Sequence, residues 1–187
     1  MKIKASQVRK GMAVEFKDEL YRVTDSVHVT PGKGPAMMQI KMKRISDGTN
    51  AEHRFRPEEY VEKATLITKE YQYLYQGGSH YTFMDLETYE QLQLDEETLG
   101  DAINFLLPET IVQIQFYQGQ SVGIELPASV EIQVTETEPT LRGATATGSY
   151  KPATLETGFV TQVPPFIETG EKIRVDTRDG KYLDRAK

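Results

Sequence analysis

Apolar and polar residues alternate along most of the chain, with the period of two that is typical of half-buried β-strands. In the clearest run, methionine and isoleucine alternate with glutamine and lysine: Met38, Gln39, Ile40, Lys41, Met42, Lys43. Residues 20–29, which precede it, are rich in Val, Tyr and Thr, and this composition also favours a strand. The pattern predicts a mainly β protein.

The first 64 residues contain a series of short strands separated by polar or glycine-containing turns. Besides 20–29 and 38–43, strands are predicted at 13–16 and 51–55. About five strands within about 60 residues are typical of a small SH3-like barrel. We interpret residues 57–59 as a linker or a single helical turn that closes this domain.

Residues 65–128 have a second β pattern that is rich in tyrosine. Tyr71, Tyr73 and Tyr75 alternate before a Gln-Gly-Gly-Ser turn, and Tyr81 and Phe83 follow it, which predicts a hairpin. We interpret these rings as core residues and cross-strand pairs. A surface on which unpaired bases stack is the alternative.

One helix is predicted in this part of the chain, at residues 95–106. Asp95 is a suitable N-cap, and Pro108 ends the helix. Its apolar face is predicted to contain four residues: Leu99, Ala102, Ile103 and Leu106. With strands at 111–117 and 121–126, the pattern is that of an OB-type barrel.

Residues 129–187 are predicted to form a second OB-like barrel. Strands are expected at four places: 129–134, 158–163, 172–176 and 181–183. Asp179-Gly180 is a two-residue hairpin signal. The long polar run at 136–155 is interpreted as a loop, and such a loop is more often functional than structural filler.

Charge is unevenly distributed over these three parts. The net charge of −6 divides into +4 for residues 1–64, −9 for 65–128 and −1 for 129–187. A chain with a basic first part can approach a polyanion only in a restricted orientation. The absence of Cys, of a signal peptide and of an apolar run of about 18 residues favours a soluble cytoplasmic protein without disulfides.

The turn between 20–29 and 38–43 is the main candidate for function. Its sequence Pro31-Gly32-Lys33-Gly34-Pro35 predicts a narrow, rigid hairpin tip that presents Lys33 without a bulky neighbour. It is not a phosphate-binding P-loop, which needs a different spacing and a following helix. The three histidines have no metal-ligand spacing, and no catalytic group of residues is predicted.

Two motifs carry a resemblance to a known family. The first is Pro31-Gly32-Lys33-Gly34 followed by Ala36, and the second is Lys151–Gly158 (KPATLETG), which continues to Val163-Pro164 and Gly170. With both motifs, the whole chain resembles bacterial elongation factor P, a relative of the eukaryotic hypusine-containing factor.

The resemblance implies a fold and a function. The fold is an SH3-like (KOW-like) domain at 1–64 and two OB-fold domains at 65–128 and 129–187, arranged in an L that mimics tRNA. The function is to bind both subunits of the ribosome between the P and E sites and to relieve stalling at consecutive prolines. The factor is expected to be a monomer, not an enzyme, with no membrane, metal or cofactor requirement.

The family's tip lysine corresponds to Lys33, which would point at the acceptor end of the P-site peptidyl-tRNA. The tip is shaped by Pro31, Gly32, Gly34 and Pro35. Candidate RNA contacts are the neighbouring cations and part of the third domain: Lys41, Lys43, Arg44, Arg54, Arg142, Gly143, Thr145 and Lys151. The family commonly has Gly-Asp-Thr in the loop that contacts the E-site codon region, whereas Ala144 replaces the acidic residue here.

Covalent modification of Lys33 is a further implication. In many relatives an enzyme lengthens this lysine with a group such as β-lysine, and in others the tip is a glycosylated arginine. The Pro-Gly-Lys-Gly-Pro tip resembles a subgroup expected to work with bare lysine.

Two alternatives stay open. An elongation factor P-like paralogue is expected to lack the Pro-Gly-Lys-Gly tip. A general OB-fold protein that binds single-stranded nucleic acid predicts tight, salt-sensitive binding to free oligonucleotides.

Overall fold

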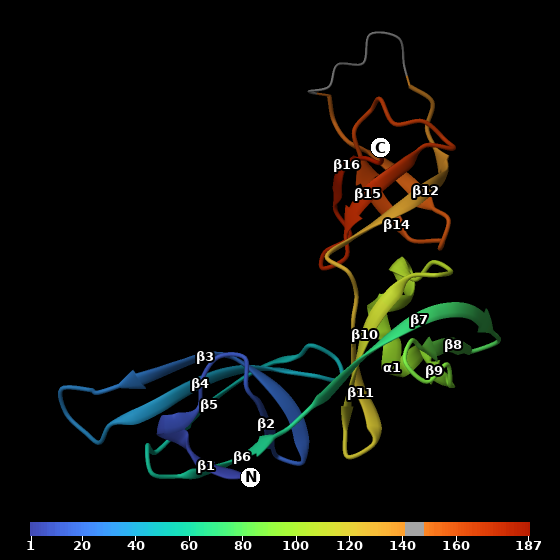
Figure 1. Ribbon diagram of the computed structural model, residues 1–187. Coiled ribbons are helices and arrows are strands. Elements are labelled where there is room, and N and C mark those ends of the chain that lie inside the picture. The colour runs from blue at the N-terminus through green and yellow to red at the C-terminus, as the bar shows by residue number, and fades with distance from the viewer. Residues whose placement is uncertain (141–147) are drawn as a thin grey trace. The chain divides into compact units, whose positions relative to one another are not determined.

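The computed structural model of the chain describes residues 1–140 and 148–187. Nearly all regular elements are strands, and they form three sheets (Figure 1). The prediction of a mainly β fold is confirmed. The chain divides into two compact units, Met1–Lys69 with Ile114–Gly123, and Glu70–Gln113 with Ile124–Lys187. The three domain boundaries expected from the sequence remain predictions.

The first sheet has six strands in the order β1-β6-β2-β3-β4-β5. Their bounds are Lys2–Lys4 (β1), Ala13–Phe16 (β2), Glu19–Val29 (β3), Met37–Arg44 (β4), Asn50–Phe55 (β5) and Tyr60–Ala64 (β6), with a 3-10 helix, η1, at Ala5–Gln7. The closing strand β6 was not predicted. It pairs with both β1 and β2, so residues 57–59 are a turn into the sheet and do not end the domain.

The alternation in β4 sets the inner face of this sheet. Met38, Ile40 and Met42 are at most 5% exposed and pack with residues of the other strands. Gln39, Lys41 and Lys43 therefore lie on the opposite face. This confirms the strand pattern predicted for residues 38–43.

The second and third sheets have the same strand order. The second contains β7 (Ile67–Gly77), β8 (His80–Asp85), β9 (Gln91–Asp95), β10 (Ile111–Tyr117) and β11 (Gln120–Glu125). The third contains β12 (Ser129–Thr137), β13 (Lys151–Leu155), β14 (Val160–Val163), β15 (Lys172–Asp176) and β16 (Tyr182–Arg185). Their orders, β11-β10-β7-β8-β9 and β14-β13-β12-β15-β16, are one topology traced from opposite edges. It is a five-stranded, partly open barrel of the OB type.

Three of the four tyrosines in β7 and β8 are core residues. Tyr71, Tyr73 and Tyr81 are at most 7% exposed, and the ring of Tyr73 lies 5.4 Å from that of Phe83. A bulge between Tyr73 and Tyr75 reverses the facing of the strand, so Tyr75 is 53% exposed. The expectation that Tyr75 shares the face of Tyr71 and Tyr73 was wrong.

The predicted helix at 95–106 is broken. Asp95 is the N-cap, and its side chain accepts a hydrogen bond of 2.8 Å from the backbone N–H of Thr98. The α-helix α1 spans only Glu96–Leu99, because Gly100 takes a positive φ of 53°, and a 3-10 helix, η2, follows at Gly100–Phe105. The cap was predicted correctly and the helix length was not.

The polar run at 136–155 contains a strand that the sequence analysis missed. Strand β13 pairs with β12 on one side and with β14 on the other. Its alternate residues Lys151, Ala153 and Leu155 are buried. The period-two pattern was not recognised because one of the inward-facing residues, Lys151, is charged.

Within the second unit, the 3-10 helix η2 joins the core of the third sheet. Phe105 is 4% exposed and clusters with residues of that sheet, including Ile132, Leu155 and Ile173. Its ring centroid lies 5.3 Å from that of Phe159. The hydroxyl of Thr157 donates a hydrogen bond of 2.7 Å to the carbonyl of Asn104. These contacts tie residues 100–105 to the third sheet.

A pH-dependent contribution to stability is expected from Asp176, in the turn after β15. Arg178 donates hydrogen bonds to this carboxylate from its guanidinium and its backbone N–H, at 2.7 and 2.8 Å, and they lower the pKa of Asp176 from 3.8 to about 2. The folded-state pKa is the lower one, so the stabilisation is complete above pH about 4 and is lost as the pH falls to about 2. Asp176→Asn should therefore lower the free energy of unfolding in urea at pH 6, and much less at pH 2. Asp101→Asn, at an exposed position, is the control and should change the free energy of unfolding at pH 6 by less than about 0.5 kcal/mol. An equal loss for Asp176→Asn at both pH values would contradict the assignment.

Candidate functional site

The Lys33 tip lies at the end of the β3–β4 hairpin. The two strands pair from Tyr21 and Arg44 to Val29 and Met37. Figure 1 shows this hairpin extending away from the other strands of its sheet. The long pairing is a reason for the tip to keep a fixed direction, because every added pair restrains the strands.

All five residues of the tip, Pro31–Pro35, are exposed. Gly34 has a φ of 115°, which L side chains rarely adopt, so a glycine is required there. Within the parts of the chain that the structure describes, the Lys33 ammonium has no ion-pair partner. The lysine is presented to solvent as the sequence predicts.

Three predicted RNA contacts share the outer face of the first sheet. Lys41, Lys43 and Arg54 are exposed. Their neighbours differ: Lys43 lies between Arg22 and Asn50, whereas Lys41 lies between the carboxylates Asp25 and Glu52. Since opposite charges on adjacent strands attract, Lys41 has less positive potential to offer a phosphate than Lys43.

Arg44 has a different environment from these three cations. It is half-buried, its guanidinium donates to Asp47 at 3.1 Å, and it lies 5.9 Å from the ring centroid of Tyr21. A side-chain hydrogen bond with Tyr21 and then the charge of Asp47 raise the pKa of Arg44. These contacts hold Arg44 against its own barrel.

The predicted contacts of the third domain are only partly visible. Arg142, Gly143 and Thr145 lie outside the described residues. Lys151 is 8% exposed, and its ammonium donates to the backbone carbonyl of Glu138. Its burial distinguishes it from the exposed cations of the first sheet.

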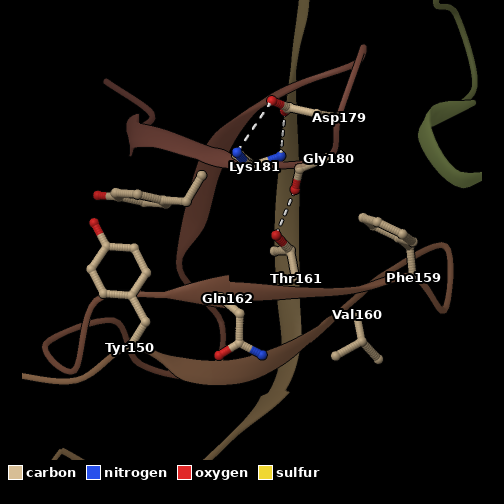
Figure 2. A pocket seen from close by; sticks show the side chains of 9 residues that line it. Tyr150, Phe159, Val160, Thr161, Gln162, Asp179, Gly180 and Lys181 are labelled. Carbon is tan, nitrogen blue, oxygen red and sulfur yellow. Dashed lines mark hydrogen bonds and ion pairs between the residues drawn. The ribbon is translucent and has the colours of Figure 1, made fainter.

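A groove in the third barrel was missed by the sequence analysis. It has a volume of about 580 Å³ and lies between the edge strands β14 and β16 (Figure 2). Its lining combines aromatic, apolar and polar side chains: Tyr150, Phe159, Val160, Thr161, Gln162, Asp179, Gly180, Lys181 and Tyr182. In OB folds, the middle strands and the loops after strands 1 and 4 bind oligonucleotides. The OB strand pattern alone could have indicated this groove.

The backbone at Gly180 is held in place beside the groove. Its carbonyl accepts a hydrogen bond from the hydroxyl of the buried Thr161. A Cβ on Gly180 would lie 2.6 Å from the ring of Phe159, and its φ is 72°. The turn Asp179–Lys181 is therefore closely fitted to β14.

Nothing in the described residues indicates a metal or catalytic centre. Among residues 1–140 and 148–187, no group of three or more His, Asp or Glu could hold a metal ion. His53 packs between the rings of Phe16 and Phe55, at centroid distances of 4.9 and 4.5 Å. None of the helices in the described part of the chain has the length and apolar character needed to cross a bilayer.

Sequence models of one family match three consecutive parts of the chain. "Elongation factor P (EF-P) KOW-like domain" matches residues 4–61, and "Elongation factor P (EF-P) OB domain" matches residues 66–124. "Elongation factor P, C-terminal" matches residues 130–185. The chain belongs to the elongation factor P family.

Similar proteins support this assignment over the full length. Elongation factor P of Symbiobacterium thermophilum is 49% identical over 184 residues, covering 98% of this chain and 100% of the relative. Elongation factor P of Coprothermobacter proteolyticus is 49% identical over 183 residues, covering 98% of each. The resemblance on which the sequence analysis relied is confirmed.

Two solved structures share part of the fold. Eukaryotic translation initiation factor 5A from Methanococcus jannaschii aligns with a TM-score of 0.53 at 22% identity, over 68% of this chain and 92% of that one. A protein of the same factor family from Naegleria fowleri aligns with a TM-score of 0.51 at 22% identity, over 67% and 98%. Together with the family's KOW-like and OB domains, they confirm the predicted fold class.

Proposed function

We propose that this member of the elongation factor P family binds the ribosome between the P and E sites and promotes peptide-bond formation at consecutive prolines. Lys33 is the residue that acts, by holding the acceptor end of the P-site peptidyl-tRNA. The observation that supports this most is a lysine without an ion-pair partner in the described residues, at the exposed tip of a long hairpin.

The physical basis is positioning. Proline is a poor nucleophile in a confined site because its ring restricts approach. Holding the tRNA end in a near-attack geometry removes part of the entropic barrier, which for well-oriented reactants reaches several kcal/mol. A lysine suits this task because its ammonium is a compact cation on a flexible stem, and the rigid tip limits the entropy lost on docking. The factor transforms no substrate itself.

The other predicted contacts contribute unequally in this proposal. Lys43 and Arg54 are exposed and meet phosphates most directly. Lys41 contributes less because Asp25 and Glu52 flank it. Contact between the E-site codon region and Arg142, Gly143 or Thr145 remains a prediction.

The proposal also covers the partners and the state of the protein. The factor acts in the cytoplasm as a monomer that contacts both ribosomal subunits, without a cofactor. Lys33 works as bare lysine, in keeping with Pro35 after Gly34; a lysine-modifying enzyme is the alternative. Exposure of the whole tip supports either state, because both need an accessible ammonium.

The test compares purified ribosomes with and without this chain. The factor should raise the rate of Pro-Pro bond formation at least about tenfold, equivalent to about 1.4 kcal/mol of barrier, and should leave a Phe-Phe control nearly unchanged. Equal rates of Pro-Pro bond formation with and without the factor would contradict the proposal.

The second candidate function is general binding of single-stranded nucleic acid. The groove favours it, because Tyr150, which lines the groove, is 54% exposed, and exposed aromatic rings stack on bases; Tyr182 beside it is half-buried. The buried Tyr71, Tyr73 and Tyr81 do not, since their rings are out of reach of a base. In the same experiment, tight and salt-sensitive binding of a free oligonucleotide without any effect on Pro-Pro synthesis would support this alternative.

A further inference from the structure

Lys151 occupies an unusual position for a lysine. It begins β13 on the same inner face as Ala153 and Leu155, and its cross-strand partner Val163 is fully buried. Lysine side chains rarely lie inside unless their ammonium has a partner, because removing a charge from water is costly. The position therefore demands an explanation beyond packing.

The ammonium of Lys151 reaches across to the preceding strand. It donates a hydrogen bond to the backbone carbonyl of Glu138, one residue after β12 ends. Among the described residues, no carboxylate forms an ion pair with it. A backbone carbonyl is thus the group that holds this charge.

Two further hydrogen bonds lie in the same region. We call this region, residues 137–140 and 148–152, the neck. The hydroxyl of Thr137 donates to the carbonyl of Pro152 at 3.0 Å. The hydroxyl of Thr140 donates to the carbonyl of Pro165 at 3.1 Å. Side chains therefore connect the neck where the regular β12–β13 ladder ends at Thr137 and Ala153.

We propose that Lys151 is a positioning residue that closes the neck and so fixes the position of residues 138–140 relative to β13. The buried stem anchors the lysine in the barrel, and the ammonium holds the Glu138 backbone at a set distance from β13. This inference rests on the proposed function, in which Arg142, Gly143 and Thr145, which follow residues 137–140 in the sequence, are predicted RNA contacts. In this proposal Lys151 does not contact RNA directly, because its ammonium is hydrogen-bonded to the Glu138 carbonyl.

The test uses the full chain with Lys151→Met, which keeps the apolar stem and removes the donor. Hydrogen–deuterium exchange should become about tenfold faster in peptides covering 137–140 and 148–150, the factor expected for loss of one hydrogen bond from a charged donor. The melting temperature should change by no more than about 4 °C, because the freed Glu138 carbonyl can be hydrated. The concentration of factor needed for half-maximal Pro-Pro synthesis should rise at least threefold. Thr137→Val, which removes a second neck bond without touching a charge, should change exchange in the same peptides.

The control is Lys172→Met, which removes an exposed lysine of β15, a strand that pairs with β12, and should change neither exchange nor concentration dependence. Unchanged neck exchange with weaker ribosome binding would overturn the proposal in favour of direct RNA contact. Faster exchange over the whole barrel would overturn it in favour of a general stabilising role. Failure of the proposed function can be distinguished from failure of this inference. In that case the wild-type chain would not accelerate Pro-Pro synthesis, whereas the exchange measurement on the neck would remain valid.

Discussion

Replacing Lys33 with alanine is expected to abolish the acceleration of Pro-Pro bond formation while leaving the fold intact. The side chain is exposed, and it makes no ion pair within the described residues, so its removal should change the melting temperature by less than about 2 °C. The rate should fall to that of ribosomes without the factor, because no other group in the described tip can hold the tRNA end. The measurement is single-turnover dipeptide or tripeptide formation on purified ribosomes.

Two controls make the Lys33 experiment specific. Lys10→Ala removes an exposed lysine of the same barrel that lies outside the hairpin and should leave the rate unchanged. The mass of the tip peptide from the native host should equal that of bare lysine, and an added mass would identify a modification of Lys33. A Lys33→Ala variant as fast as the wild type would refute the role of the tip.

Replacing Phe105 with alanine should produce a large loss of stability in the second unit. Phe105 is 4% exposed and packs with core residues of the third sheet and with the ring of Phe159. Deleting a buried phenylalanine side chain costs about 3 to 5 kcal/mol, from lost burial and the cavity that remains. The free energy of unfolding in urea should fall by this amount.

The Phe105 substitution should also separate two parts of that unit. Phe105 belongs to η2 and contacts the third sheet, so its loss weakens the coupling between η2 and that sheet. The single unfolding transition of the unit should then become two. Tyr89→Ala, at a 71% exposed position, is the matched control and should cost less than about 0.5 kcal/mol. A loss for Phe105→Ala no larger than that of the control would show that η2 does not belong to this core.

The sequence by itself determined most strands, the Asp95 cap and the candidate tip. A period-two alternation such as that of 37–44 is local, and it specifies a buried face whatever strand lies beside it. The Pro-Gly-Lys-Gly-Pro turn is equally local, since two prolines and two glycines restrict the backbone directly. The family resemblance also followed from two short motifs.

Only the tertiary structure decided the features that depend on partners distant in sequence. Strand β6 is specified by pairing with β1 and β2, and Phe105 is buried by the third sheet and not by its own helix. Lys151 looks like one more cation in the sequence, yet the register of β13 turns it inward onto the carbonyl of Glu138. The groove at Tyr150 exists because β14 and β16 come close without pairing. A sequence records which residues are apolar or charged, but burial and pairing are set by the strands that the fold brings alongside, and these lie far away in the chain.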